Sequence, residues 1–543
     1  MLQKFHWGAL GLLWLLAGAC AAQTIAPDIL ERQLAELAEA DPHGHAKLYE
    51  ALDELYQAMG YRFIWDDPVL EEQLQAAVAL SPDDGLLASD YPLPSIADLL
   101  ADGANGVAEA VVRRDLLWSR SFAFLLRHLY FGKADPSASH ASWNLPDLRH
   151  LDDQPLLVSD ALRHRDIPGL IALARPQQHF YADLKGKLAE YRDIERRGGW
   201  PPFAAQPLLK PGASAAVVPA LRQRLRMVGD YADIAHADST VYDDALVDAV
   251  KRFQQRHLLE ADGIIGADTW SAFAIPVAQK IVQIRANLER MRWALKGLGG
   301  DFLLVDIAGF QLYQLSDGEV RWSSPVQVGK PYRQTPVFSS TIRYLEWNPT
   351  WTVPPTILDQ DVLPAIKRDP GYLQRKNMVV LTHSGDPVDP ETVAWDRYPE
   401  ERFPYLLRQL PGPHNALGTV KFIFPNEHAV YMHDTPSRRL FNESSRAFSS
   451  GCIRVGEPYE LAKLLLQAQI ALSDDDIANI LASGETQRQH LDKPFPVVIL
   501  YWTTKWTNDG GLIFAPDIYQ RDQSIVLVLD QPLPLSSQRA AAL

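Results

Sequence analysis

The sequence predicts a multidomain α+β protein, in which a helical N-terminal half precedes a mainly β domain that carries a long insertion. The chain has 543 residues, which is too long for one compact core and indicates two to four domains. Apolar residues recur at helical spacing up to Leu295, and extended segments begin at Phe302. Hydrophobic residues make up 47% of the chain and charged residues 22%, as in ordinary globular proteins.

Residues 1–22 have the pattern of a secretory signal peptide. Lys4 precedes an apolar run from Trp7 to Leu16, and small residues 17–22 follow. The run is shorter than the roughly 20 residues that span a membrane. Cleavage after Ala19 or Ala21 fits best, and a lipid on Cys20 is the alternative. We therefore expect a periplasmic protein whose only membrane contact would be that lipid.

Residues 23–210 predict a helical scaffold. Leu48, Leu52, Leu55 and Met59 follow one amphipathic helical stripe, and a second stripe runs from Trp118 to Leu129. His43 and His45 form a His-x-His pair, but two ligands are too few for a metal site. We expect no metal and no cofactor.

Residues 211–276 predict a small three-helix module, and residues 277–300 a linking helix. The ordered string from Phe253-Gln254 through Asp262-Gly263 to Thr269 resembles the peptidoglycan-binding module of cell-wall enzymes. His257 stands where that module usually has glycine. The resemblance implies a binding function, since the string contains no catalytic group.

Residues 301–515 predict a mainly β domain, with Asp317-Gly318 in a hairpin turn. Residues 356–417 interrupt it with many prolines and weak periodicity, as an insertion does. Insertions of this length are usually lids or disordered loops, and the aromatic residues here favour an ordered lid. Residues 516–543 are expected to form a C-terminal tail.

The net charge of −15 argues against a sequence-independent nucleic-acid binder, which needs a basic surface. The chain has two cysteines, Cys20 and Cys452, so the mature domains hold one thiol and no internal disulfide. A lone thiol in an oxidising compartment is either buried or used.

The candidate catalytic residues lie close in sequence to this thiol, Cys452. His433 ends a predicted strand, and about a dozen loop residues lead from Pro436 to the Cys452 segment. A nearby imidazole or cation such as Arg454 activates a thiol. The N–H groups of Gly451 and Cys452 are candidate oxyanion donors, each contributing about 3–4 kcal/mol to a transition state.

Arg454 can also bind a substrate carboxylate through two parallel hydrogen bonds. Taken alone, a cysteine is commonly a small buried hydrophobe and a strand-end histidine is commonly structural. The combination of His433 with Ser450-Gly451-Cys452-Ile453-Arg454 favours catalysis instead.

The strings His433-Asp434-Thr435-Pro436 and Ser-x-Gly-Cys-Ile-Arg454 resemble the signature of the YkuD-type L,D-transpeptidases. The strings 348–355 and 411–418 resemble the large, periplasmic, YcbB-like branch of that family. The resemblance covers nearly the whole mature chain. It implies a helical scaffold, a peptidoglycan-binding module and a catalytic β domain with a capping insertion.

The resemblance implies that Cys452 attacks the third residue of a donor tetrapeptide stem and that the terminal D-Ala leaves. His433 would act as base, and the amine of an acceptor stem would resolve the thioester into a 3→3 cross-link. Acylation by carbapenem β-lactams is also implied. Tyr431, on the same strand face as His433, is expected to line the donor site. Ser450 replaces the histidine often found before the glycine.

What orients His433 is open, and a backbone carbonyl fits better than the Asp434 side chain. L,D-carboxypeptidation, with water as the acceptor, needs the same residues and stays open. A non-catalytic wall-binding protein is a further alternative. A papain-like protease is a poor fit, because its motif is absent and because here the histidine precedes the cysteine. The sequence also lacks the ligand motifs of zinc enzymes.

Overall fold

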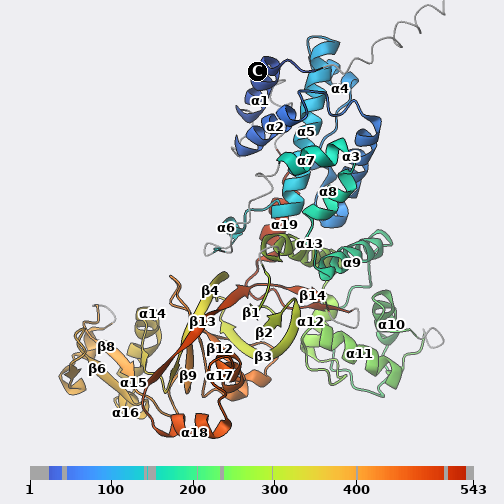
Figure 1. Ribbon diagram of the computed structural model, residues 1–543. Coiled ribbons are helices and arrows are strands. Elements are labelled where there is room, and N and C mark those ends of the chain that lie inside the picture. The colour runs from blue at the N-terminus through green and yellow to red at the C-terminus, as the bar shows by residue number, and fades with distance from the viewer. Residues whose placement is uncertain are drawn as a thin grey trace, which may run out of the picture.

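The computed structural model describes residues 24–39, 46–139, 143–144, 155–204, 206–232, 238–295, 298–398, 402–506 and 511–533. The expected signal peptide with Cys20, and the pair His43 and His45, lie outside the described residues. The predicted α+β organisation is confirmed, with a helical N-terminal part, a small helical module and a mainly β C-terminal domain (Figure 1).

The N-terminal helices pack around one apolar core, in which Trp65, Phe122 and Leu125 are almost fully buried. A buried carboxylate joins three segments of this part, because Asp115 accepts hydrogen bonds from the Tyr56 hydroxyl (2.6 Å) and the Trp65 amide (2.8 Å). The helices are α1 Pro27–Glu39, α2 Ala46–Ala58, α3 Pro68–Leu80, η1 Ser81–Asp84, η2 Ala88–Asp90, α4 Ile96–Ala101, α5 Val107–Phe131, α6 Pro136–Ser139, α7 Pro155–Arg163 and α8 Ile167–Ala174.

The small module consists of α10 Val218–Met227, α11 Asp244–Arg256 and α12 Ala267–Ala274, around a core of its own. His257, the residue in place of glycine, is buried and stacks on Phe253 with a centroid distance of 3.9 Å. Its ring also lies 5.8 Å from Phe514 of the β domain. The departure from the usual glycine therefore provides a contact between the module and the β domain.

The linking helix α13 Val277–Ala294 lies between the helical part and the β domain (Figure 1). It packs against α9 His179–Arg196, which shares an apolar cluster with it rather than with the N-terminal core. Phe514 belongs to the same cluster. Residues 179–196, expected as part of the scaffold, thus pack mainly on the linking helix.

The β domain is a nine-stranded sheet in the order β11-β3-β12-β10-β9-β4-β13-β1-β2, and an additional β2–β3 pairing closes it on itself. Parallel pairs (β10 with β12, β1 with β13, β11 with β3) are combined with antiparallel ones. The strands are β1 Phe302–Asp306, β2 Gln311–Ser316, β3 Glu319–Gly329, β4 Phe338–Trp347, β9 Val420–Ile423, β10 Met432–His433, β11 Ala447–Ser449, β12 Ile453–Val455 and β13 Gln487–Leu500.

The predicted Asp317-Gly318 hairpin turn connects β2 to β3. Both residues have positive φ (52° and 81°), as the two central residues of a type I′ turn require. The sheet is accompanied by η7 Arg438–Asn442, α17 Pro458–Leu466 and α18 Asp474–Ala482, and a second hairpin is formed by β14 Thr504–Trp506 and β15 Leu512–Phe514.

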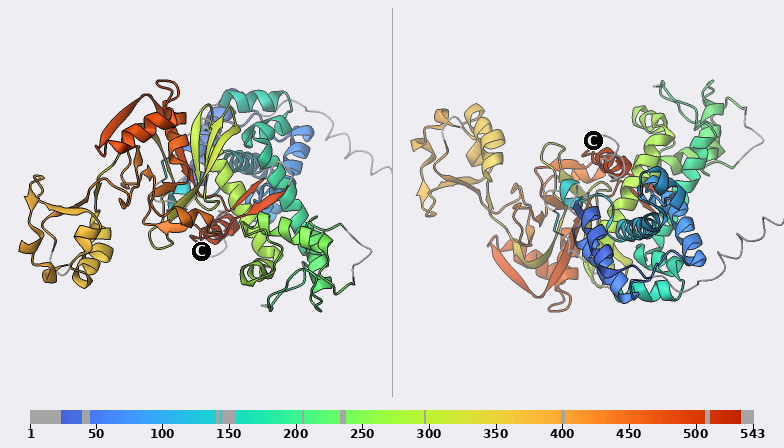
Figure 2. Two further views of the ribbon diagram at one scale, coloured as in Figure 1. Left: turned by 90° about the horizontal axis from the view of Figure 1, so that it is seen from below. Right: turned by 90° about the horizontal axis from the view of Figure 1, so that it is seen from above.

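The insertion is an ordered subdomain with its own core, and it projects from one side of the sheet (Figure 2). Trp395 and Phe403 stack at 5.6 Å, and Leu363 and Leu407 are buried beside them. Its sheet has the order β5-β8-β6-β7. The elements are β5 Trp351–Thr352, α14 Pro355–Ile357, η4 Leu358–Val362, α15 Leu363–Arg368, α16 Tyr372–Arg375, β6 Met378–Leu381, β7 Pro387–Val388, η5 Pro390–Thr392, η6 Trp395–Arg397 and β8 Leu406–Gln409.

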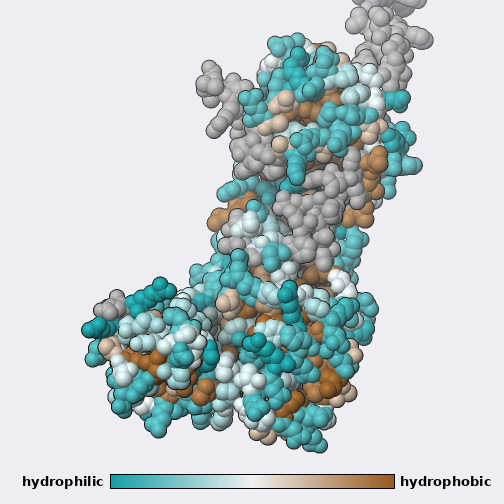
Figure 3. All heavy atoms as spheres, turned by 60° about the vertical axis from the view of Figure 1, so that its left-hand side comes forward, coloured by the Kyte–Doolittle hydropathy of each residue, from teal (hydrophilic) through white to brown (hydrophobic). Residues whose placement is uncertain are grey.

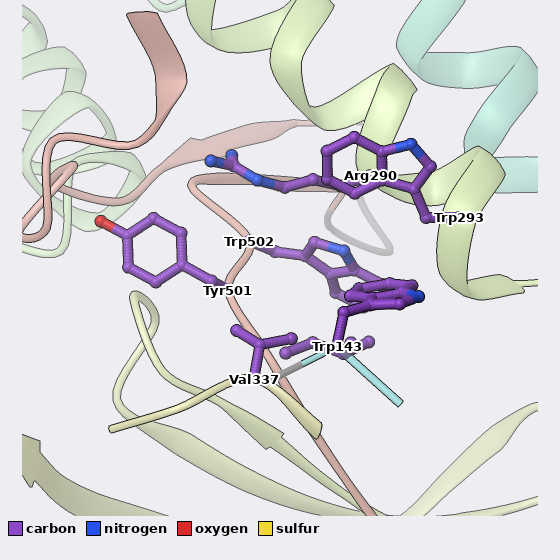
Figure 4. Close-up of a pocket in the computed structure, with 7 residues that line it drawn as sticks. Trp143, Arg290, Trp293, Val337, Tyr501 and Trp502 are labelled. Carbon is purple, nitrogen blue, oxygen red and sulfur yellow. The ribbon is translucent and has the colours of Figure 1, made fainter. Parts of the chain in front are cut away.

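A small aromatic pocket marks the junction between α13 and the β domain (Figure 4). Trp293 of α13 packs edge-on against Trp143 at 5.7 Å, and the Arg290 guanidinium lies 5.1 Å from the Tyr501 ring centroid. Trp502 lines the same pocket. Large side chains from three distant segments thus connect the helical part to the sheet.

The expectation of a C-terminal tail is wrong for residues 516–533. They include a helix, α19 Asp522–Asp530, which enters the N-terminal core with Ile525, Val526 and Leu529. Lys133 donates to the Leu529 carbonyl (2.8 Å), and Arg290 pairs with Asp522 (2.5 Å). The segment is ordered because its apolar face is buried against partners far away in the sequence.

One face of the molecule is mainly hydrophilic, with several separate hydrophobic areas (Figure 3). Within the described ranges, no helix combines the length and the apolar character needed to cross a membrane.

We predict that Leu529→Ala lowers the free energy of unfolding by about 2–5 kcal/mol, because it leaves a cavity in the N-terminal core. The side chain of Leu529 is 0% exposed, whereas Leu527 on the same helix is 57% exposed and provides a matched control. Urea denaturation measures both variants. Equal stability of the two variants would show that α19 does not support the core.

Candidate active site

The site is built on three neighbouring strands, β12, β10 and β9. The parallel pairing of β10 with β12 places His433 opposite Arg454, and the antiparallel pairing with β9 places it opposite Lys421. The Ile453 amide donates to the Tyr431 carbonyl (3.1 Å), so Cys452 lies level with Tyr431. Residues from three distant segments thereby meet at one place on the sheet.

Side-chain alternation decides which residues face the site. Met432, Phe422 and Ile453 are 0% exposed and belong to the sheet's apolar core. Because successive side chains of a strand point to opposite faces, Tyr431, His433, Cys452, Arg454 and Lys421 share the other face. The structure thus brings the predicted residues Cys452, His433, Tyr431 and Arg454 together on one polar surface.

Cys452 is a free, partly buried thiol. Burial raises its pKa above the ordinary 9.0, while hydrogen bonds from the backbone amide and hydroxyl of Tyr431 and the positive charges of Lys421 and Arg454 act in the opposite direction. Its sulfur lies 3.9 Å from the Ala429 carbonyl oxygen. The thiol is therefore protonated at neutral pH, within a setting that favours the thiolate once the proton is removed.

His433 is 3% exposed, and its Nδ1 lies 2.5 Å from the Asp434 carbonyl oxygen. Since a carbonyl can only accept, Nδ1 carries the hydrogen, and in the neutral ring Nε2 carries the lone pair. The expectation that a backbone carbonyl orients the ring is confirmed, and the Leu417 carbonyl is a second such contact. Burial, and to a lesser extent Arg454, lowers the pKa of His433 to about 3. The imidazole is neutral at physiological pH.

The Asp434 carboxylate has a different role. It accepts from the amide and hydroxyl of Thr419 (3.0 and 2.9 Å) and pairs with Arg438 (2.8 Å). These bonds fix the chain direction just after β10. The backbone carbonyl of Asp434 is thereby held against the imidazole.

The loop before Cys452 differs in one respect from the expectation. The Gly451 amide, expected as an oxyanion donor, already donates to Ser449 Oγ (3.1 Å). Gly451 has φ +114°, a backbone conformation that favours glycine. Only the Cys452 amide of the expected pair has no partner among the described residues.

Ser450 and Arg454 are held by polar neighbours. Ser450 Oγ accepts from Arg333 (2.8 Å), and Arg454 donates to Gln327 Oε1 (3.2 Å). The Arg454 Nε is buried and lacks a partner within the described part of the chain. Arg454 therefore keeps hydrogen-bonding capacity for a further group.

The insertion borders the site at two points. Arg333 binds Asp361 (2.6 Å) and Gln360 (2.6 Å) of η4 while it also holds Ser450. Trp351 of β5 donates a side-chain hydrogen bond to Tyr431. The insertion is thus connected both to the nucleophile loop and to the tyrosine that contacts the sulfur.

Sequence reasoning missed Lys421, Trp351 and Arg333. Lys421 Nζ lies 4.0 Å from the Tyr431 ring centroid, and burial lowers its pKa. The sequence places Lys421 on the polar face of the predicted strand 419–424, which could have marked it as a candidate. The sequence does not show that this strand pairs with β10, so it could not place Lys421 beside His433. No group of three or more His, Cys, Asp or Glu among the described residues is placed to hold a metal ion.

Comparison with known families agrees with this layout. Residues 300–498 match the L,D-transpeptidase catalytic domain of the YkuD family, residues 50–188 match a scaffold domain, and residues 214–273 match a domain provisionally described as peptidoglycan-binding. A Haemophilus influenzae protein, provisionally named as an L,D-transpeptidase, is 36% identical over 251 residues. The match covers 46% of this chain and 50% of that protein, so the chain spans about half the length of this relative.

Two solved structures are more distant. The L,D-transpeptidase of Stackebrandtia nassauensis is 13% identical, over 55% of this chain and 97% of that one, with a TM-score of 0.21. An L,D-transpeptidase in complex with imipenem is 17% identical, over 37% and 60% of the two chains, with a TM-score of 0.17. On the sequence matches, this chain carries a YkuD-type L,D-transpeptidase catalytic domain together with a peptidoglycan-binding domain.

Proposed function

We propose that the protein is a peptidoglycan L,D-transpeptidase that forms 3→3 cross-links through a thioester on Cys452. The observation that carries this proposal is the polar face shared by Cys452 and His433, with Nδ1 of the imidazole bound to a carbonyl and Nε2 left as a base. The strand register makes Cys452 and His433 diagonal neighbours on one face of adjacent strands. Proton transfer requires that Nε2 comes within hydrogen-bonding distance of the sulfur in the substrate complex.

The first half-reaction acylates the enzyme. His433 Nε2 takes the thiol proton as the sulfur attacks the carbonyl of the third stem residue. The Cys452 amide donates a hydrogen bond to the carbonyl oxygen and stabilises the negative charge that develops there. Collapse of the tetrahedral intermediate breaks the peptide bond, and the protonated imidazole returns its proton to the leaving D-Ala amine. Tyr431 and Lys421 stabilise the thiolate while it forms, which offsets the raised pKa of the thiol.

The second half-reaction transfers the acyl group. The side-chain amine of an acceptor stem attacks the thioester, and His433 removes a proton from that amine. The C–S bond then breaks, and His433 returns the proton to the sulfur to restore the thiol. Arg454, whose Nε has no partner among the described residues, would bind a substrate carboxylate. The free Cys452 thiol would react in the same way with a carbapenem, whose strained β-lactam amide takes the place of the donor peptide and opens to leave a thioester on the sulfur.

The accessory parts are proposed to serve the same substrate. The module 211–276 would hold the enzyme on peptidoglycan, and the insertion 356–417 would cap the bound stems beside domain 301–515. We place the mature protein in the periplasm, exported by residues 1–22. Cleavage after Ala19 or Ala21 is preferred to a lipid on Cys20.

We predict that purified disaccharide-tetrapeptide is converted into 3→3 dimers with release of D-Ala, as measured by chromatography and mass spectrometry. Cys452→Ala abolishes the reaction, and His433→Gln lowers it by about 100-fold or more, as for loss of a general base. His164→Gln is the matched control, because the exposed His164 ring also contacts a backbone carbonyl through Nδ1 (2.7 Å). Accumulation of tripeptide without dimers would identify a carboxypeptidase instead. An unreacted substrate would point to a wall-binding protein.

We also predict that Cys452 is a high-pKa thiol. Because iodoacetamide reacts with the thiolate, its reaction rate with the protein lacking residues 1–22 should keep rising above pH 9. Lys421→Met should move the midpoint to still higher pH, because it removes a positive charge that favours the thiolate. A plateau reached near neutral pH would instead reveal a preformed thiolate–imidazolium pair.

A further inference from the structure

The loop between β3 and β4 passes close to the nucleophile and contains a fully buried threonine, Thr335, which is 0% exposed. Its hydroxyl donates to the Gly451 carbonyl (2.8 Å) and accepts from the Gly329 amide (2.9 Å). The loop folds back tightly, since a Cβ on Gly329 would lie 2.2 Å from the Arg333 carbonyl oxygen. Thr335 is therefore held at a defined distance from the residue before Cys452.

In the nucleophile turn, residues 449–452, one backbone group of Gly451 and Cys452 has no hydrogen-bond partner among the described residues. Gly451 N–H donates to Ser449 Oγ (3.1 Å), and Ser449 Oγ donates to the Cys452 carbonyl (2.5 Å). The Gly451 carbonyl accepts from Thr335. Of the four N–H and C=O groups of Gly451 and Cys452, only the Cys452 N–H has no partner among the described residues.

The geometry of the peptide bond connects Thr335 to that N–H. The Gly451 carbonyl and the Cys452 amide belong to one planar trans unit, in which C=O and N–H point in opposite directions. When Thr335 holds the carbonyl on one side, the Cys452 N–H is fixed on the other. A donor that is already oriented stabilises an oxyanion without reorganising during the reaction.

The C-terminal segment supports Thr335 in turn. The Tyr519 hydroxyl accepts from the Thr335 amide (3.1 Å) and donates to the Gly329 carbonyl (2.7 Å). The Tyr519 ring is 6% exposed and stacks on Tyr501 at 5.2 Å. Tyr519 lies three residues before α19, whose apolar face is buried in the N-terminal core. A chain of buried contacts thus runs from the scaffold to the nucleophile turn.

We propose that Thr335 is a positioning residue for the oxyanion donor, the Cys452 N–H, and that Tyr519 supports it. The inference rests on the proposed acyl transfer, because only a reaction at a carbonyl develops an oxyanion. It assigns a catalytic purpose to two residues outside the Cys-Ile-Arg signature, one of them in a segment expected to be a tail.

The test compares two reactions of the same thiol. Acylation by imipenem passes through an oxyanion, whereas alkylation by iodoacetamide displaces iodide and forms none. We expect Thr335→Val to lower the limiting acylation rate by about 10- to 100-fold, below the full effect of losing an oxyanion donor. Two quantities should stay within about twofold of their wild-type values: the concentration of imipenem that gives half the limiting rate, and the rate of alkylation. Acylation is followed by stopped-flow absorbance and by intact mass.

Three further variants complete the experiment. Thr335→Ser keeps the hydroxyl and should recover most of the rate. Tyr519→Phe should show a smaller loss of the same kind, and it carries the test if Thr335→Val does not fold. Tyr332→Phe, in the same loop and 73% exposed, is the control and should behave as the wild type.

Two results would overturn the inference while leaving the proposed function intact. One is a Thr335→Val variant that is acylated as fast as the wild type. The other is a loss of acylation and alkylation in equal proportion, which would indicate a structural effect on the thiol. If the wild type is alkylated but never acylated at Cys452, the proposed function fails and the inference fails with it.

Discussion

The parallel pairing of β10 with β12 is the constraint on which the rest of the site depends. It sets Cys452 level with Tyr431 and His433 level with Arg454, and it sends Met432 and Ile453 into the apolar core. A shift of one residue in this register would bury the imidazole in the core and expose Met432. Burial of the apolar side chains therefore holds the polar ones in place.

The same burial determines the charge state of the site. It raises the pKa of the Cys452 thiol and lowers that of His433 to about 3, so both groups are neutral before substrate binds. Lys421 and Arg454 add to the lowering of the His433 pKa. They do not reverse the rise in the pKa of the thiol, but they reduce the cost of forming the thiolate. In such a site the thiol proton moves to the imidazole during the reaction, and no thiolate–imidazolium ion pair exists before the substrate binds.

Local sequence was sufficient for much of this structure. Helical periodicity, the Asp317-Gly318 turn and the change to extended segments predicted the confirmed fold class, and the residues around Cys452 and His433 predicted which side chains the sheet brings together. Strand alternation also favoured a backbone carbonyl over the Asp434 side chain as the group that orients His433, and the structure identifies it as the Asp434 carbonyl. These features depend on residues that are close together in the chain.

The rest depends on pairing between distant segments, which a single sequence does not encode locally. Lys421 joins the site only because β9 pairs with β10, and Thr335 only because its loop packs against Gly451. The segment after residue 515 looks like a tail, since its apolar face is short, but that face is buried by helices several hundred residues earlier. Gly451 N–H was misjudged because the Ser449 hydroxyl reaches back to it.

The central claim is that His433 Nε2 can exchange a proton with the Cys452 sulfur. A crystal structure of the protein acylated by a carbapenem tests it most directly. We expect electron density joined to Cys452 Sγ, with His433 Nε2 within hydrogen-bonding distance of that sulfur. The thioester carbonyl oxygen of the adduct should accept a hydrogen bond from the Cys452 amide. An imidazole turned away from the sulfur, or an adduct on another residue, would contradict the account.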